Sequence, residues 1–301
     1  METVEAGKRI ALKNILFATD FSACSNAALT YAVSIARRYG ATLHAVHVRS
    51  MGPEMLVMSP DSWAAVAEAE ERTERGYLEE LEKRLQELPH DVMTPTGKVV
   101  NALAKIITER DIDLMVLGTH GRTGVRKLFV GSVAEEVFRR IACPVLSVGP
   151  SVSSQPNGEM QFRQILFPTD FGEESLAALP YAISLAEEDQ SQLALLHVVE
   201  QPAAGIADLE DVKASLTRRL KELVPPEAES WCRAEYLLQF GRQFAPPAEP
   251  ILEVAREHRA DLIVLGVRPA RRAASAATHL IHTTAQHIVA HAACPVLTVR
   301  A

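Results

Sequence analysis

The chain has 301 residues, of which 48% are hydrophobic and 5% aromatic, and its formal net charge at pH 7 is −7. This length suits two domains of about 150 residues each, and the acidic balance argues against nucleic-acid binding. No apolar run approaches the roughly 18 residues of a membrane span, the N-terminus lacks the apolar core of a signal peptide, and four cysteines are too few for a disulfide framework. We therefore expect a soluble cytoplasmic protein with no nucleic-acid or membrane partner.

In the first half of the chain, short apolar runs alternate with helical patterns. Strands are predicted at 14–19, 41–48, 91–95, 113–118 and 144–148, and helices at 26–38, 62–88, 99–109 and 133–141. Gly40 follows the first helix at the place of a C-terminal capping glycine. The charged run of the second helix is expected to be a solvated face. Strands that alternate with helices predict an α/β fold, a parallel sheet covered by helices on both faces.

The second half repeats the first. The segment ILFATDFSACSNAALTYAVSIARRYGATLHAVHV, from Ile15 to Val48, is identical at 17 of 34 positions to the segment that starts at Ile165, at a constant offset of 150. The repeat predicts further strands at 164–169, 192–198, 232–240, 261–266 and 295–299. Residues 151–161 are polar and without periodicity, which is typical of a linker. We therefore expect two domains, 1–150 (the first copy) and 162–301 (the second copy).

A glycine-rich segment follows the fourth strand of the first copy. The stretch GTHGRTGVRKLFVGS, from Gly118 to Ser132, holds four of the 15 glycines and leads into a helix. Unpaired N–H groups and the dipole at a helix N-terminus favour anions, and glycine lets the backbone turn with positive φ and approach a phosphate. Ser132 could cap the helix or donate to a phosphate oxygen. Neither the P-loop nor the GxGxxG motif is present.

The spacing Gly118-x2-Gly121-x9-Gly131-Ser132 resembles the nucleotide-binding signature of the universal stress protein family. NILFATDFS, LHAVHV, DIDLMVLGTHGRTG and VGSVAEEVFRRIACPVLSV are similar to the family's first, second and fourth strands and to its last helix and strand. The resemblance extends over both halves and nearly the whole chain.

This resemblance implies two tandem Rossmann-like domains of the adenine nucleotide alpha hydrolase type, each with a parallel sheet of order 3-2-1-4-5. It implies ATP, with or without Mg²⁺, between strands one and four of the first copy. It also implies that the fifth strands of the two copies pair in an intrachain pseudo-dimer. Asp20 would lie near the ribose, and the Val48 backbone would meet the adenine. The implied nucleotide-binding residues are Ala18, Thr19, Asp20, Val48, Gly118, His120, Gly121, Gly131, Ser132 and Val133.

Plainer explanations exist for these residues. Asp20 and Ser132 could be helix caps, Thr19 and Val48 could be strand ends, and His120 could be a solvated loop residue. The motif glycines could serve only a turn, although a turn needs one glycine and not three. The cations Arg122, Arg126 and Lys127 could help to hold a triphosphate or could be ordinary exposed loop residues.

The second copy departs from the signature. It keeps counterparts of the nucleoside half, in Pro168, Thr169, Asp170 and Val198. In the phosphate half, Gly266 matches Gly118, but Pro269, His282 and Thr283 stand at the places of Gly121, Gly131 and Ser132, and the interval to the last strand is three residues longer. Proline lacks an N–H, and a histidine side chain is bulky where the backbone should approach phosphate. Arg268, Arg271 and Arg272 could form another anion site or only an exposed loop. The sequence thus predicts one nucleotide site, in the first copy.

Other clusters suggest less. His279, His282, His287 and His291 lack a third zinc ligand at a familiar spacing, so a solvated helix is favoured over a metal site. Cys24 near a helix N-terminus could be reactive, but a packed thiol is favoured, as for Cys143 and Cys294.

The predicted function is a regulatory stress-response module that binds ATP and hydrolyses it slowly at most, with no catalytic residue assigned. A nucleotide-independent interaction scaffold is the main alternative. An ATP pyrophosphatase or nucleotidyltransferase is disfavoured, because ATDFSACS stands where those enzymes carry their loop motifs. The protein partner stays unidentified, and a homodimer of the whole chain stays open.

Overall fold

The computed structural model describes residues 10–50, 60–121, 131–152, 160–199, 209–241, 247–268 and 284–300. The first copy contains β1 (Asn14–Ala18), α1 (Ala23–Tyr39), β2 (Thr42–Val46), α2 (Pro60–Leu85), β3 (His90–Met93), α3 (Val99–Glu109), β4 (Leu114–Gly118), α4 (Ser132–Arg140) and β5 (Val145–Val148). The second contains β6 (Gln164–Pro168), α5 (Glu173–Asp189), β7 (Gln192–Val199), α6 (Leu209–Lys221), a short 3-10 helix (Pro226–Ser230), β8 (Arg233–Phe240), α7 (Ala248–Glu257), β9 (Leu262–Val267), α8 (Thr284–His291) and β10 (Val296–Arg300).

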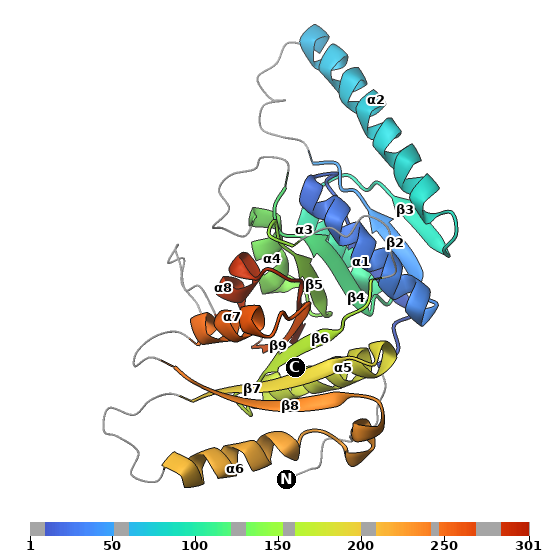
Figure 1. Cartoon of the computed structure of the whole chain (residues 1–301). Helices are drawn as coiled ribbons and strands as arrows, with labels where there is room; N and C mark the ends of the chain where they lie inside the picture. Colours follow the sequence, from blue (N-terminus) through green and yellow to red (C-terminus); the bar gives the residue numbers. More distant parts are fainter. Residues whose placement is uncertain are drawn as a thin grey trace.

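The ten strands form one sheet of order β3-β2-β1-β4-β5-β10-β9-β6-β7-β8. Each half has the predicted order 3-2-1-4-5, and all pairs within a half are parallel. The α2 and α6 helices lie at opposite ends of this sheet (Figure 1). None of the described helices is long and apolar enough to cross a membrane.

The two halves meet through an antiparallel pair, β5 with β10. Leu146 lies opposite Leu297 in this pair, and Ser147 lies opposite Val296. The pairing removes two exposed strand edges that would otherwise be open to other chains. The predicted intrachain pseudo-dimer is therefore confirmed, and it makes the sheet mixed.

Side chains alternate between the two faces of the sheet. Ile15 and Phe17 of β1 belong to a core cluster that continues through α1 of the first copy and α5 of the second. Leu16 points to the opposite face, where α3 and α4 cover the first copy. The second copy has its own cluster on that face, beneath α7 and α8. Helices thus cover both faces, as the sequence predicts.

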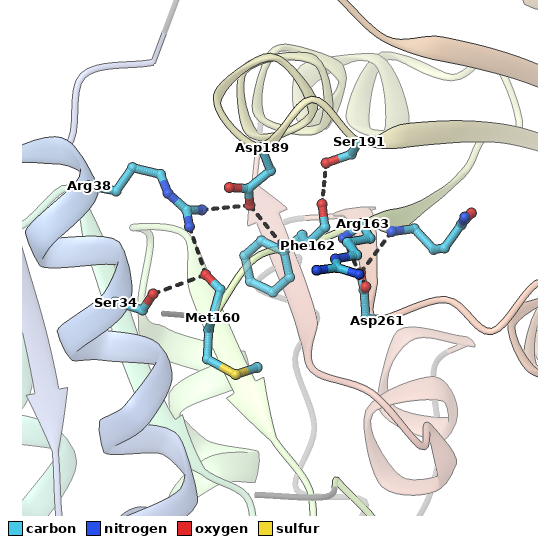
Figure 2. A network of polar contacts seen from close by, with 9 residues as sticks. Ser34, Arg38, Met160, Phe162, Arg163, Asp189, Ser191 and Asp261 are labelled. Carbon is cyan, nitrogen blue, oxygen red and sulfur yellow. Dashed lines mark hydrogen bonds and ion pairs between the residues drawn. The ribbon is translucent and has the colours of Figure 1, made fainter. Parts of the chain in front are cut away.

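The segments before β1 and β6 each cross to the other copy. The N–H of Ile10 donates to the Ser184 hydroxyl of α5, at 3.0 Å. In return, Ser34 and Arg38 of α1 donate to the carbonyl oxygen of Met160, at 3.0 and 2.7 Å, as Figure 2 shows. The α1 helix is thus hydrogen-bonded to the segment before β6, and α5 is hydrogen-bonded to the segment before β1.

A buried ion pair completes this junction. The guanidinium of Arg38 donates to Asp189 at 2.5 Å, and the Asp189 carboxylate also accepts the N–H of Phe162 at 2.8 Å (Figure 2). Burial raises the pKa of Asp189 even though both donors favour its charged form. The unfavourable effect of desolvation on the charged carboxylate is therefore larger than the favourable effect of its two hydrogen-bond donors.

The proposed domain limits remain a prediction, and linker residues 153–159 lie outside the described residues.

Acid is expected to destabilise the first copy through His44 of β2. Burial, followed by the nearby Arg110 guanidinium, lowers the pKa of His44 below its ordinary value of 6.5. As the pH falls below 6.5, His44 is therefore protonated in the unfolded chain before it is protonated in the folded protein. The free energy of unfolding decreases over the pH range between 6.5 and the lower pKa of the folded protein.

His44→Ala tests this expectation, because Ala194 is the buried residue at the matching position of the second copy. The stability of the variant should fall less between about pH 7 and about pH 5 than that of the wild type. Urea melts at several pH values measure the difference. Equal slopes for the two proteins would show that His44 is not responsible.

Candidate functional site

A cavity of about 1040 Å³ opens at the carboxyl ends of β1, β2 and β4 in the first copy. This is the crevice where α/β sheets of this order bind ligands. Nine of the ten residues predicted to bind a nucleotide line it, namely Ala18, Thr19, Asp20, Val48, Gly118, Gly121, Gly131, Ser132 and Val133. His120 does not line the cavity.

The turn between β1 and α1 forms one wall of the cavity. The Thr19 hydroxyl accepts the N–H of Phe21 at 3.0 Å, and the Asp20 carboxylate accepts the N–H of Ser22 at 3.0 Å. Phe21 has a φ of 61°, a left-handed value that a residue with a large side chain seldom adopts. Ser22, and not Asp20, is the N-cap of α1, so the capping explanation for Asp20 does not apply.

His47 holds this turn from β2. Its ring Nδ1 lies 2.8 Å from the carbonyl oxygen of Thr19, and its ring centroid lies 4.6 Å from that of Phe21. The second copy repeats both contacts, since His197 lies 2.8 Å from the oxygen of Thr169 and 4.7 Å from Phe171. The motif spacing does not point to His47, but the histidine recurs as His197 at the offset of 150, which is a usable sequence signal.

The backbone of Val48 faces the cavity because β1 ends before β2 does. The pairing with β1 stops at Val46, whose oxygen accepts the N–H of Thr19, whereas His47 and Arg49 bond to the β3 side. Within the described residues, neither the N–H nor the C=O of Val48 makes a hydrogen bond. One donor and one acceptor from the same residue thus point into the cavity, where a ligand with a matching edge would satisfy both.

Close contacts surround the positions of the three motif glycines. A Cβ on Gly118 would lie 2.7 Å from backbone atoms of Cys24 and Ser25, so this glycine lets the N-terminus of α1 pack on β4. A Cβ on Gly121 would lie 2.7 Å from the Asp20 carboxylate, and one on Gly131 would lie 3.0 Å from the oxygen of Thr119. None of the three has a left-handed φ. The expectation of positive φ at these positions is therefore wrong. Backbone contacts limit the space at Gly118 and Gly131, whereas the neighbour of Gly121 is the movable end of a side chain.

The N-terminus of α4 forms the other end of the cavity. Gly131 is its N-cap without a side-chain bond, and the Gly131 N–H donates to the oxygen of Thr119 at 2.8 Å, which closes the loop. The first-turn amides of Ser132, Val133 and Ala134 have no acceptor within the helix, and all three residues line the cavity. Ala134 was missed because it carries no polar side chain. Together with the helix dipole, these amides make this end suitable for an anion.

His120 does not line the cavity. Its ring Nδ1 lies 2.9 Å from the Thr119 hydroxyl, and its carbonyl oxygen accepts the Ser22 hydroxyl at 3.1 Å. The structure therefore connects His120 to the walls of the site and not to its interior. The cations Arg122, Arg126 and Lys127 lie outside the described residues.

The α2 helix supplies a wall that the sequence did not predict. Glu70, Thr73 and Glu74 line the cavity on one helix face. Glu74 pairs with Arg49 at 2.8 Å, and Tyr77 on the same face stacks on Phe21 with ring centroids 4.9 Å apart. The charged run is therefore only partly a solvated face, because the spacing i, i+3, i+4 and i+7 turns these residues toward the site.

The cysteine and histidine clusters show no reactive site in the described residues. Burial raises the pKa of Cys24, and it raises the pKa values of Cys143 and Cys294 to about 12, so these thiols stay protonated at neutral pH. His287 bonds Glu249 at 2.8 Å, an acidic neighbour that sequence spacing did not predict, but no group of three metal ligands occurs there. His279 and His282 lie outside the described residues.

The second copy keeps the turn but changes the loop. Thr169 and Asp170 repeat the bonds of Thr19 and Asp20, with the N–H groups of Phe171 and Gly172, each at 2.9 Å. Although burial raises it, the pKa of Asp170 is lowered overall by the Gly172 N–H and other partners, Arg268 among them. Arg268 also lies 3.4 Å from Glu174. Pro269, Arg271, Arg272, His282 and Thr283 lie outside the described residues.

The retained glycine of the second copy has a packing reason. A Cβ on Gly266 would lie 1.9 Å from the oxygen of Glu174 at the start of α5. Gly266 is the counterpart of Gly118, so both copies keep glycine where a helix packs closely on the fourth strand. Retention of Gly266 is therefore no evidence for a second ligand site.

Comparisons with known proteins agree with this fold. The model of the universal stress protein family matches residues 11–149 and 161–300. A universal stress protein of Methanocaldococcus jannaschii is 30% identical over 138 residues, covering 45% of this chain and 81% of that protein. Universal stress protein A homolog 1 of Coxiella burnetii is 33% identical over 143 residues, covering 45% and 95%. A crystal structure of a universal stress protein from Archaeoglobus fulgidus shares the fold, with a TM-score of 0.66 and 19% identity over 95% of this chain and 98% of that one.

Proposed function

Because the chain belongs to the universal stress protein family, in tandem form, we propose that its first copy binds ATP as a regulatory module of a stress response. The observation that carries this proposal is the placement of two kinds of unsatisfied backbone group in one cavity. The Val48 donor and acceptor lie on one wall, and the first-turn amides of α4 lie on another. A ligand that joins a flat heterocycle to an anion would satisfy both.

Adenine suits the Val48 wall, since its N6 amino group donates and its N1 accepts at neighbouring positions on one edge of the ring. The ribose hydroxyls would donate to Asp20, which lines the cavity with Thr19 and Ala18. The phosphates would accept from the amides of Ser132, Val133 and Ala134 and from the Ser132 hydroxyl. Gly118, Gly121 and Gly131 would contribute by leaving room, and Mg²⁺ would enter with the triphosphate.

We propose a binding function and, at most, slow ATP hydrolysis. Asp20 is engaged with the N–H of Ser22, and His120 does not line the cavity. Asp20 and His120 are the side chains of the binding motif whose chemistry suits a general base, and both are held by contacts within the protein. All four cysteines are free thiols, which persist in a reducing compartment and support a cytoplasmic location. The second copy would serve as a folding partner, and the protein that receives the signal stays unidentified.

The test begins with the protein purified without added nucleotide, denatured, and examined by mass spectrometry for released small molecules. Calorimetric titration of the stripped protein with Mg-ATP should then give one site per chain. Two sites would show that the second copy also binds. No site and no carried nucleotide would favour the nucleotide-independent interaction scaffold.

A matched pair of variants assigns the site to one copy. Asp20→Ala should weaken ATP binding at least about tenfold, because a buried hydrogen bond to a charged group is worth about 1.5–3 kcal/mol. Asp170→Ala removes the equivalent carboxylate and the equivalent turn bond in the second copy, and it should leave ATP affinity unchanged. Equal losses in the two variants would contradict a site confined to the first copy.

A further inference from the structure

Ser22 joins the two walls of the site. Its hydroxyl accepts the N–H of Ser25 at 3.2 Å, as the N-cap of α1, and donates to the carbonyl oxygen of His120 at 3.1 Å. The second bond links the turn after β1 to the loop after β4, which lies 98 residues away in the sequence. This polar side-chain contact ties the nucleoside wall to the glycine loop.

The second copy shows what the chain looks like without this contact. Gly172 replaces Ser22, and its backbone is nearly the same, with φ −76° and ψ 161° against −73° and 166°. The N–H of each residue donates to the preceding aspartate, at 2.9 and 3.0 Å. The turn and the helix therefore form without the hydroxyl, so folding of this segment does not require it.

The contact continues to the anion end of the cavity. His120 follows Thr119, and the oxygen of Thr119 accepts the N–H of Gly131, the N-cap of α4. Ser22 thus fixes the start of the glycine loop at a point one residue from the bond that closes it. A shift at His120 would move Thr119 and, through it, the unpaired amides of α4.

We propose that Ser22 is a positioning residue for the phosphates, acting through the His120 carbonyl and the loop. This inference rests on the proposed function. The inference predicts different effects on the nucleoside and on the phosphates. The nucleoside contacts at Val48 and Asp20 lie on walls that form without the bond between Ser22 and His120. Loss of the bond should therefore lower the affinity for ATP and leave the affinity for adenosine nearly unchanged.

The experiment compares Ser22→Gly, Ser22→Thr and wild-type protein in calorimetric titrations with Mg-ATP and with adenosine. Ser22→Gly installs the residue of the second copy, and glycine is an acceptable N-cap. The expected result is an increase of about tenfold in the dissociation constant for ATP, the order of one lost hydrogen bond, with the adenosine value within about twofold. Ser22→Thr keeps the hydroxyl and should bind ATP with the wild-type affinity. Gly172→Ser should change neither the ATP affinity nor the adenosine affinity.

The outcomes separate this inference from the proposed function. Equal losses for ATP and adenosine in Ser22→Gly would reveal a general structural role and overturn the positioning role. Unchanged affinity for both ligands would overturn it as well. Wild-type protein that binds adenosine but gains nothing from the phosphates would refute the phosphate site itself, on which the inference depends.

Discussion

Gly266→Ala is expected to destabilise the second copy by about 3 kcal/mol, the upper part of the usual range for overpacking. The added methyl group would lie 1.9 Å from the oxygen of Glu174 and 2.4 Å from the Cα of Ser175, all backbone atoms at the start of α5. Backbone cannot rotate away as a side chain does, so α5 must move off β9. Gly118→Ala should have the same effect on the first copy to a smaller extent, since its closest backbone atoms lie at 2.7 Å.

Gly76→Ala is the matched control. Gly76 lies inside α2, and nothing comes within 4 Å of the position that its added methyl group would take. Alanine is a better helix former than glycine, so this variant should gain up to about 1 kcal/mol. Guanidinium melts of the three variants give the comparison. A Gly266→Ala protein as stable as the wild type would mean that β9 and α5 are not in this close contact.

The glycines also show where sequence patterns were sufficient and where they were not. The spacing of Gly118, Gly121 and Gly131 selected residues that line one cavity, because the motif residues lie at strand and helix ends that the topology brings together. It did not reveal why glycine is required there. The contacts with Cys24 and Asp20 depend on how the start of α1 packs against the end of β4, and the contact with Thr119 depends on where α4 begins. Neither arrangement has a local sequence signature.

Some features of the secondary structure and of the site were likewise predictable from the sequence, and others were not. Strand order and the β5–β10 pair were implied by the family resemblance, whereas the repeat indicated that both halves share one fold. The helix predicted at 26–38 begins earlier, at Ala23, since the Ser22 cap permits a first turn of small residues without apolar spacing. Arg49, Glu70 and Glu74 were not predicted at the site. Arg49 reaches it from the end of β2, and Glu70 and Glu74 reach it from α2, whose far end is anchored by buried Leu81 and Leu85.

Phe162→Ala is expected to lower the stability of both copies together, by about 4 kcal/mol. Phe162 is 2% exposed, and its ring lies 6.2 Å from that of Tyr31 in α1. It belongs to the second copy by sequence, yet it packs against the first. Because one core cluster continues through α1 and α5, a cavity at this point removes contacts from both halves.

Calorimetric unfolding distinguishes a single cooperative unit from two independent domains. A single unit predicts one transition in the wild type and one transition at a lower temperature in Phe162→Ala. Leu220→Ala, in α6 at the far end of the sheet, is the control, since Leu220 is fully buried but distant from the junction. If the copies were independent, both variants would shift only a second-copy transition and leave the first unchanged. A single shared transition would instead mean that the stability of the copy proposed to bind ATP depends on a partner whose sequence has lost two of the three motif glycines.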